Sequence, residues 1–127
     1  MNPFSVDVKD MLDGDSNLEL TFGTDLFVGT DPTEPDNVVG IFDTSGWAPD
    51  VKHNYENPTV QVLVRNRSYV TGWTVAHDIM QFLHNKHEET WNGTRYLAIF
   101  AQSDVLFIGR DEHDRFMFSV NFRCTRV

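Results

Sequence analysis

The sequence predicts an α+β fold, in which a mixed, mostly antiparallel sheet of about five to six strands carries one long amphipathic helix and a short N-terminal helix. Two patterns lead to this prediction. In residues 94–126, apolar and polar residues alternate as they do in half-buried strands. Residues 68–85 instead repeat their apolar positions with helical spacing. The expected strands are 24–29, 37–43, 58–65, 94–101, 104–109 and 115–125.

The C-terminal strands carry the clearest signal. The apolar residues of the last strand share one face: Phe116, Phe118, Val120, Phe122 and Cys124. The polar run 110–115 is long enough to reverse the chain, so strands 104–109 and 115–125 should form an antiparallel hairpin. Residues 96–101 are apolar on both faces, and we therefore expect this strand at the centre of the sheet, covered on both sides.

Shorter signals place the elements of the N-terminal half. Asn2 and Pro3 are suited to begin a short helix. The apolar residues of this helix fall on one side: Phe4, Val8, Met11 and Leu12. Residues 58–65 alternate strictly, with Pro58 at the first position, where a strand tolerates proline. The loop 30–36 combines prolines with acids, which predicts a solvated connection between two neighbouring strands.

The long helix is expected over residues 68–85, with Ser68 as its cap. Its apolar stripe comprises Tyr69, Gly72, Trp73, Ala76, Ile79, Met80 and Leu83. We expect Trp73 to lie in the core between helix and sheet. Gly72 weakens a helix, so its place in this stripe indicates a close approach to a strand. The expected last turn suits the negative end of the helix dipole, because it holds His84, Lys86 and His87.

Length and composition limit the possible functions. The 127 residues should form one domain, 1–127, whose core needs neither metal nor disulfide. A net charge of −9 argues against a surface that wraps nucleic acid, because such binding depends on Lys and Arg. From the residues near its start and from its hydropathy, we expect no secretory leader and no membrane-spanning stretch. The single cysteine, Cys124, is expected to be a small buried side chain.

No catalytic or metal-binding motif is complete. His77, His84 and His87 share the predicted helix, but no carboxylate or cysteine joins them at ligand spacing. The acidic segment 13–20 resembles the start of a calcium loop, yet it lacks the required Gly and the final Glu. His113 is expected to be a turn residue. We therefore expect no enzymatic activity, no bound metal and no cofactor.

Residues 44–57 form the longest stretch without periodicity. This stretch carries Trp47, Pro49 and Tyr55, and exposed aromatic residues on an irregular segment indicate a contact surface. The alternative is that Trp47 folds back over the edge of the core. Trp47, Pro49 and Tyr55 are the candidate contact residues for a neighbouring subunit or another partner.

Several short motifs, taken in their order and spacing, resemble the tailed-phage minor capsid proteins that include the tail terminators. They are GTDLFVG at 23–29, PDNVVGIFDTSG at 35–46, NPTVQVLVR at 57–65, GTRYL at 93–97, FIGRD at 107–111 and FSVNF at 118–122. The resemblance covers most of the chain from Gly23 onward. The family motifs contain no catalytic residue.

The resemblance implies a structural protein of the virion, located in the tail or neck region and assembled in the host cytoplasm. Such a protein caps the end of the tail tube and joins it to the head-side connector, as a ring, commonly a hexamer, around the DNA channel. The implied partners are further copies of the chain, the tail tube protein and the connector or neck protein, while DNA passes without sequence-specific binding. The alternatives are a head-completion or neck connector protein and a non-viral intracellular adaptor domain.

A ring around DNA could use an anionic wall, because such a wall repels phosphates and lets the genome pass. Two acidic clusters could supply this wall. The first, on the loop with two prolines, is Asp31, Glu34 and Asp36; the second, on the hairpin turn, is Asp111, Glu112 and Asp114. The sequence does not choose between the clusters, and the alternative is that both are solvated turns.

Overall fold

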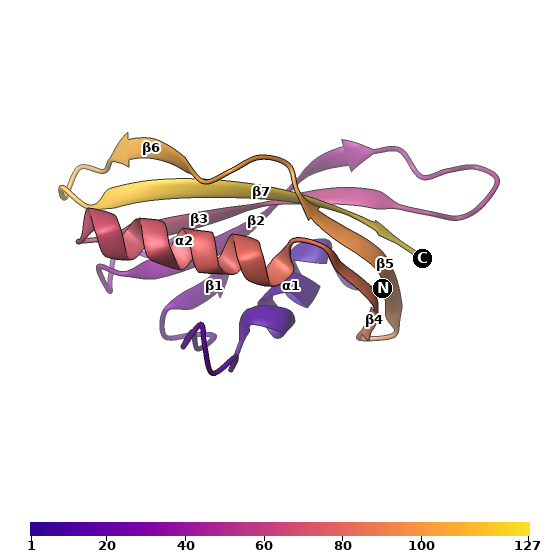
Figure 1. The fold of residues 1–127 in the computed structure, drawn as a ribbon, viewed down its shortest axis with the longest axis horizontal. Coiled ribbons are helices and arrows are strands. Elements are labelled where there is room, and N and C mark those ends of the chain that lie inside the picture. The colour runs from indigo at the N-terminus through magenta and orange to yellow at the C-terminus, as the bar shows by residue number, and fades with distance from the viewer.

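The computed structural model describes residues 1–127 as two helices and one curled sheet (Figure 1). The elements are α1 (Phe4–Leu12), β1 (Leu26–Val28), β2 (Val38–Trp47), β3 (Asn57–Asn66), α2 (Tyr69–Leu83), β4 (Lys86–Trp91), β5 (Thr94–Ala101), β6 (Leu106–Arg110) and β7 (Phe116–Arg126). Both helices cover the same face of the sheet (Figure 1). The predicted α+β class is confirmed, but the sheet has seven strands rather than five or six.

The strands run in the order β1-β2-β3-β7-β5-β4, with β6 also paired to β7. The β1–β2 pair is parallel and all other pairs are antiparallel. The centre of the sheet is therefore β3 and β7, and β7 carries both β5 and β6 along its other edge. The expectation of a central, doubly covered strand at 96–101 was wrong, because β5 lies next to the edge strand β4 and is only partly buried.

One core holds the two layers together. Val60, Val62 and Val64 of β3 lie opposite Phe122, Val120 and Phe118 of β7, and all of these side chains are buried under the helices. The alternation that predicted a half-buried last strand is thus confirmed, and Cys124 is buried on the same face as expected. The buried face of α1 also matches the prediction, although Pro3 rather than Asn2 occupies its N-cap position.

The N-terminal half of α2 lies very close to β7. The Ser68 hydroxyl accepts a hydrogen bond from Thr71 N at 3.3 Å, so the predicted cap is confirmed. A Cβ atom on Gly72 would lie 2.8 Å from the Phe118 ring, which explains why the helix has glycine there. The prediction that Trp73 lies in the core was wrong. Its side chain is 40 % exposed, and its ring stacks on that of His77 with 4.7 Å between the ring centroids.

The end of α2 also differs from the prediction. The helix stops at Leu83, and His84 already has an extended backbone, so the expected basic last turn does not exist. Lys86 and His87 instead begin β4, which the sequence analysis did not predict. This edge strand is mostly polar and has no fully buried residue, so it lacks the apolar alternation that reveals other strands. Its signal was the Asn92-Gly93 turn, where both residues have positive φ (51° and 80°) and join β4 to β5 as a tight hairpin.

The ends of the chain are tied together by a buried polar network. The Tyr96 hydroxyl donates a hydrogen bond to the buried Asp7 carboxylate of α1. Arg126 Nη1 donates to the Tyr96 oxygen at 3.2 Å, and Arg126 also pairs with Glu56 at 3.1 Å. Burial of the phenol and its bond to Asp7 raise the pKa of Tyr96, so this hydroxyl stays protonated and available as a donor. Neither helix is long and apolar enough to cross a membrane.

Candidate assembly surfaces

The strands β2 and β3 continue beyond the rest of the sheet as a hairpin, which we call the arm and define as residues 44–57 (Figure 1). The sequence analysis treated these residues as an irregular loop, but β2 runs on to Trp47 and pairs with Asn57. Every residue from 43 to 55 is exposed. Gly46 permits the close pairing at the base of the arm, because any Cβ there would collide with Asn57 O.

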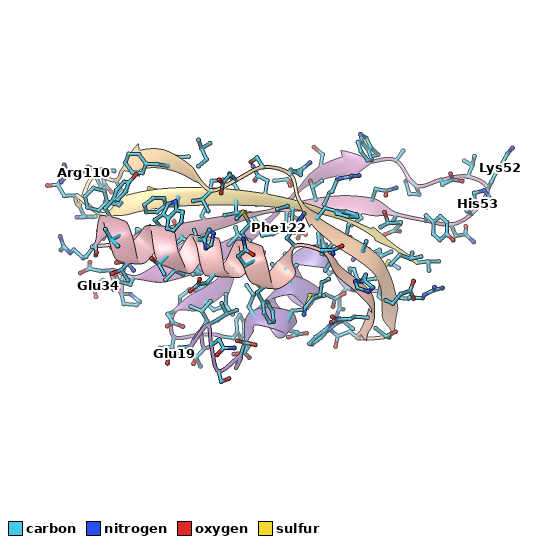
Figure 2. All side chains as sticks on the ribbon, viewed as in Figure 1. Glu19, Glu34, Lys52, His53, Arg110 and Phe122 are labelled. Atoms are coloured by element: carbon cyan, nitrogen blue, oxygen red, sulfur yellow. The ribbon has the colours of Figure 1, made fainter.

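The tip of the arm is an ordered turn. Asp50 N donates to Tyr55 O at 3.0 Å, and the Asp50 carboxylate accepts from the backbone N–H of Lys52 and His53 at 2.7 and 3.0 Å. Figure 2 shows Lys52 and His53 at one extreme of the long axis of the molecule. These hydrogen bonds fix the backbone of the turn without support from the core.

The three predicted contact residues all lie on the arm and are exposed: Trp47, Pro49 and Tyr55. Trp47 is 66 % exposed, so it does not cover the edge of the core. Its ring lies under the Arg123 guanidinium, 5.6 Å away, and this contact orients it at the base of the arm. Near the tip, the Tyr55 ring lies 6.0 Å from that of His53.

The two cations without a carboxylate partner lie on the arm or beside its base. Of the 10 Lys and Arg residues, all but Lys52 and Arg123 form an ion pair with Asp or Glu. Lys52 is at the tip, and Arg123 lies over Trp47 at the base. Lys52 lies on the arm two residues from Asp50, whose carboxylate accepts two backbone hydrogen bonds, and Arg123 lies on β7 beside the base of the arm.

The opposite end of the molecule holds the loop 30–36, which wraps around the buried guanidinium of Arg65. Arg65 donates to the carbonyl oxygens of Pro32 (2.6 Å), Thr33 (3.2 Å), Pro35 (2.7 Å) and Asp36 (3.1 Å), and it pairs with the Asp31 carboxylate at 3.2 Å. The loop does join two neighbouring strands, as predicted, but it is fixed to β3 rather than freely solvated. No local sequence pattern connects Arg65 to this loop.

A second buried arginine, Arg115, joins this loop to the β6–β7 turn. Its guanidinium contacts Asp111 at 2.7 Å, Asp36 at 3.4 Å and the carbonyl oxygen of Thr33. The two predicted acidic clusters are therefore one continuous surface, which we call the acidic end, comprising Asp31, Glu34, Asp36, Asp111, Glu112 and Asp114. Figure 2 shows Glu34 and Arg110 there, far from Lys52.

Arginines neutralise most of the acidic end. Arg67 pairs with Asp36 at 3.0 Å, and Arg110 pairs with Asp114 at 3.2 Å, in addition to the contacts of Arg65 and Arg115. Burial alone would raise the pKa of Asp111, but hydrogen bonds from Arg115 and from two backbone N–H groups hold that pKa at about 2. The Arg67 hydrogen bond likewise lowers the pKa of Asp36. Among the six acids of the acidic end, only Glu34 and Glu112 have no Lys or Arg partner.

An exposed apolar surface lies beside the acidic end. We call it the β6 patch and define it as Tyr69, Trp73, Leu106, Phe107 and Ile108, each between 40 and 57 % exposed. The Tyr69 ring meets Phe107 edge-on at 5.2 Å, which joins α2 to β6. Sequence reasoning missed this surface, because it treated 104–109 as an ordinary hairpin strand. The missed signal was the run 105–108, which is apolar without alternation or charge on a strand that has one open edge.

The family model for bacteriophage tail terminator proteins matches residues 15–127. The chain belongs to the bacteriophage tail terminator family. As a member of this family it is a structural component of the virion, in the tail or neck region. The predicted resemblance is thereby confirmed at the level of the tail terminators. No curated protein matches the sequence significantly.

The fold of this tail terminator family member also occurs in a solved virion. A chain in the structure described as "Virion of native gene transfer agent (GTA) particle" matches it with a TM-score of 0.71 and 14 % sequence identity, over 98 % of this chain and 94 % of that chain. At this identity the likeness concerns the fold alone. It extends over nearly the whole chain, including α1, which lies before the matched residues of the family model.

The histidines and acids considered as metal ligands in the sequence analysis make other contacts in the structure. His77 stacks on Trp73, His84 Nδ1 accepts from Ala101 N at 3.0 Å, and His87 lies on β4, so the three do not converge. No group of three or more His, Cys, Asp or Glu residues could hold a metal ion. In the calcium-like segment, Asp13 and Asp15 instead accept hydrogen bonds from backbone N–H groups.

Proposed function

We propose that this protein ends the tail tube and joins it to the head-side connector as a ring of identical subunits, a hexamer, through which DNA passes. Family membership supports the tail-end location. The observation that carries the proposal is the arm, where every residue from 43 to 55 is exposed although the stretch includes Trp47, Val51 and Tyr55. Exposed apolar side chains on an ordered projection are typical of surfaces that become buried in an assembly.

Trp47, Pro49 and Tyr55 are the contact residues in this proposal. Aromatic anchors carry a large share of the binding energy of many interfaces, because they bury large rigid surfaces at a low entropic cost. The arm offers such anchors on a hairpin whose own hydrogen bonds keep it extended. The partners are a second copy of the chain, the tail tube protein and the connector.

The protein acts without catalysis, metal or cofactor in this proposal. Burial raises the pKa of the Cys124 thiol to about 12, so the chain has no thiolate nucleophile near neutral pH. The buried Asp7, Tyr96 and Arg126 satisfy one another and hold α1 to the sheet. These groups stabilise the fold and are closed to a substrate.

DNA passes through the ring without sequence-specific contacts in this proposal, because a chain with a net charge of −9 repels phosphates. The acids predicted to face the channel are Asp31, Glu34, Asp36, Asp111, Glu112 and Asp114. Among them, Glu34 and Glu112 carry the charge that no arginine offsets. A wall role therefore depends mainly on these two side chains.

Native mass spectrometry of the purified protein, together with electron microscopy of the tail end in virions, tests the proposed assembly. The proposal predicts six copies in a closed ring at the junction between tube and connector. A single copy per virion, or a location away from that junction, would refute it.

A further inference from the structure

We infer that the arm of each subunit docks on the β6 patch of the next copy, with the acidic end of that copy facing Lys52. This inference rests on the proposed ring, names its subunit interface, and gives Glu34 and Glu112 an interface role in place of the channel-wall role. The arm and the β6 patch lie at opposite ends of the long axis (Figure 1, Figure 2). Two different surfaces at opposite ends join copies head to tail, and such a contact forms a ring when the rotation between copies closes.

The β6 patch has the properties of a receiving surface. β6 pairs only with β7, so its outer edge presents unpaired backbone N–H and C=O groups. Leu106, Phe107 and Ile108 carry no charge, whereas exposed edge strands usually carry charges or proline that prevent pairing. On the side of the sheet that carries α2, Phe107 contacts Tyr69, while Leu106, opposite Ser119 of β7, presents its side chain on the other side of the same edge. An edge of this kind accepts an extended segment and apolar anchors together.

Charge complementarity identifies the occupant as a second copy of the chain. Lys52, at the tip of the arm, is one of the two cations without a carboxylate partner. Glu34 and Glu112 are the two carboxylates of the acidic end without a Lys or Arg partner, and the acidic end adjoins the β6 patch. The unpaired ammonium of Lys52 thus complements the two unpaired carboxylates of the acidic end.

The apolar parts of the two ends match in the same way. The arm contributes Trp47, Val51 and Tyr55, and Val51 is 96 % exposed. The patch contributes the side chains of Tyr69, Trp73 and β6. Docking removes both apolar surfaces from water and places Lys52 near aromatic faces and carboxylates. The anionic phosphates of DNA would be repelled by the acidic end and cannot be the ligand of this patch.

Cysteine cross-linking tests the inference directly, because the single native cysteine, Cys124, is buried and gives little background. Val51→Cys and Ile108→Cys are combined in one chain, and the purified protein and virions that contain it are treated with a short bismaleimide. Both sites are exposed, so the variant should fold, and an unchanged melting temperature verifies this. We expect a ladder of cross-linked species that ends at the ring, with 51–108 links between copies identified by mass spectrometry.

The matched control combines Val51→Cys with Ser16→Cys, an exposed position in the turn after α1, and should give at least tenfold fewer links between copies. Links between two copies of residue 51, or links from residue 51 only to other virion proteins, would overturn the arm-to-patch contact while leaving the ring intact. Virions that contain only one copy of the chain would instead overturn the ring itself. The two failures are therefore distinguishable.

Discussion

Two buried arginines shape the acidic end at the level of single residues. Arg65 and Arg115 are buried, and each donates hydrogen bonds to carbonyl oxygens and carboxylates of segments that are distant in the sequence. Their guanidinium groups need these partners, because a buried charge without hydrogen bonds is costly. The loop 30–36 and the β6–β7 turn are consequently parts of one rigid surface.

Arg115→Met should lower the free energy of unfolding by roughly 2–3 kcal/mol, because it removes the ion pairs with Asp111 and Asp36 and the bond to Thr33 O. Urea denaturation measures the change. Arg110→Met is the matched control: its pair with Asp114 is exposed, so we expect a loss of less than about 1 kcal/mol. Equal losses in the two variants would contradict the anchoring role of Arg115.

Asp111 makes stability depend on pH. Its pKa is about 2 in the folded chain, and about 3.9 is usual for an unfolded one, so the folded state binds protons less readily. The stabilisation is complete above about pH 5 and is lost as the pH falls toward 2. Asp111→Asn should be less stable than the parent at pH 7 and lose less stability between pH 5 and pH 2. Parallel pH profiles for the two proteins would show that Asp111 makes no such contribution.

At the level of elements, the strands with strict alternation could be predicted from the sequence. β3 and β7 form the centre of the sheet, and alternation identifies their buried faces because one face meets the helices. β4 lacks this pattern, since it is an edge strand of mostly polar residues, none of which is fully buried. The sequence also could not predict that β7, rather than β5, is central, because strand order depends on long-range pairing.

Trp73 lies in the apolar stripe of the predicted helix but is partly exposed, so helical spacing alone does not establish burial. The contact line of α2 runs through Gly72, Ala76, Ile79 and Leu83, and the residue after Gly72 points about 100° away from that line. Gly72 brings the backbone so close to Phe118 that no space remains for an indole ring between helix and sheet. Residue spacing alone could not reveal this crowding.

Trp73→Ala should therefore cost about 1 kcal/mol, since the ring is partly exposed and loses mainly its contact with His77. Ile79→Ala, on the buried contact line of the same helix, should cost about 2–5 kcal/mol by leaving a cavity. Chemical denaturation of both variants provides the comparison. A larger loss for Trp73→Ala than for Ile79→Ala would place the indole in the core after all.

The sequence could single out Trp47, Pro49 and Tyr55 as candidate contact residues, but it could not predict the joined acidic end or the β6 patch. Trp47, Pro49 and Tyr55 stand out because no core periodicity explains them. The joining of the two acidic clusters depends on Arg115, which lies 82 residues from Thr33 in sequence. The patch depends on which edge of β6 stays open, and this is a property of the assembled sheet.

At the level of the whole molecule, the unpaired cation Lys52 lies at one end of the long axis, and the unpaired carboxylates of Glu34 and Glu112 lie at the other. Glu34→Lys combined with Glu112→Lys separates the two roles considered for these acids. An interface role predicts that rings fail to form in native mass spectrometry, because Lys52 of the neighbour is repelled. A channel-wall role predicts intact rings and slower DNA ejection.

A control with the same change in charge, Glu19→Lys combined with Asp78→Lys, alters exposed residues away from both ends and should affect neither measurement. Intact rings and normal ejection in the Glu34 and Glu112 variant would contradict both roles and leave these acids as solubilising surface charge.

The length of tails assembled with a variant that combines Trp47→Ala and Tyr55→Ala tests the proposed function of the arm. Both side chains are exposed, so the free protein should keep its melting temperature and circular dichroism spectrum. If the arm is needed to end the tail tube, electron microscopy should show tails of irregular, extended length without attached heads. Tails of uniform parental length joined to heads would contradict the claim that this protein completes the tail through its arm.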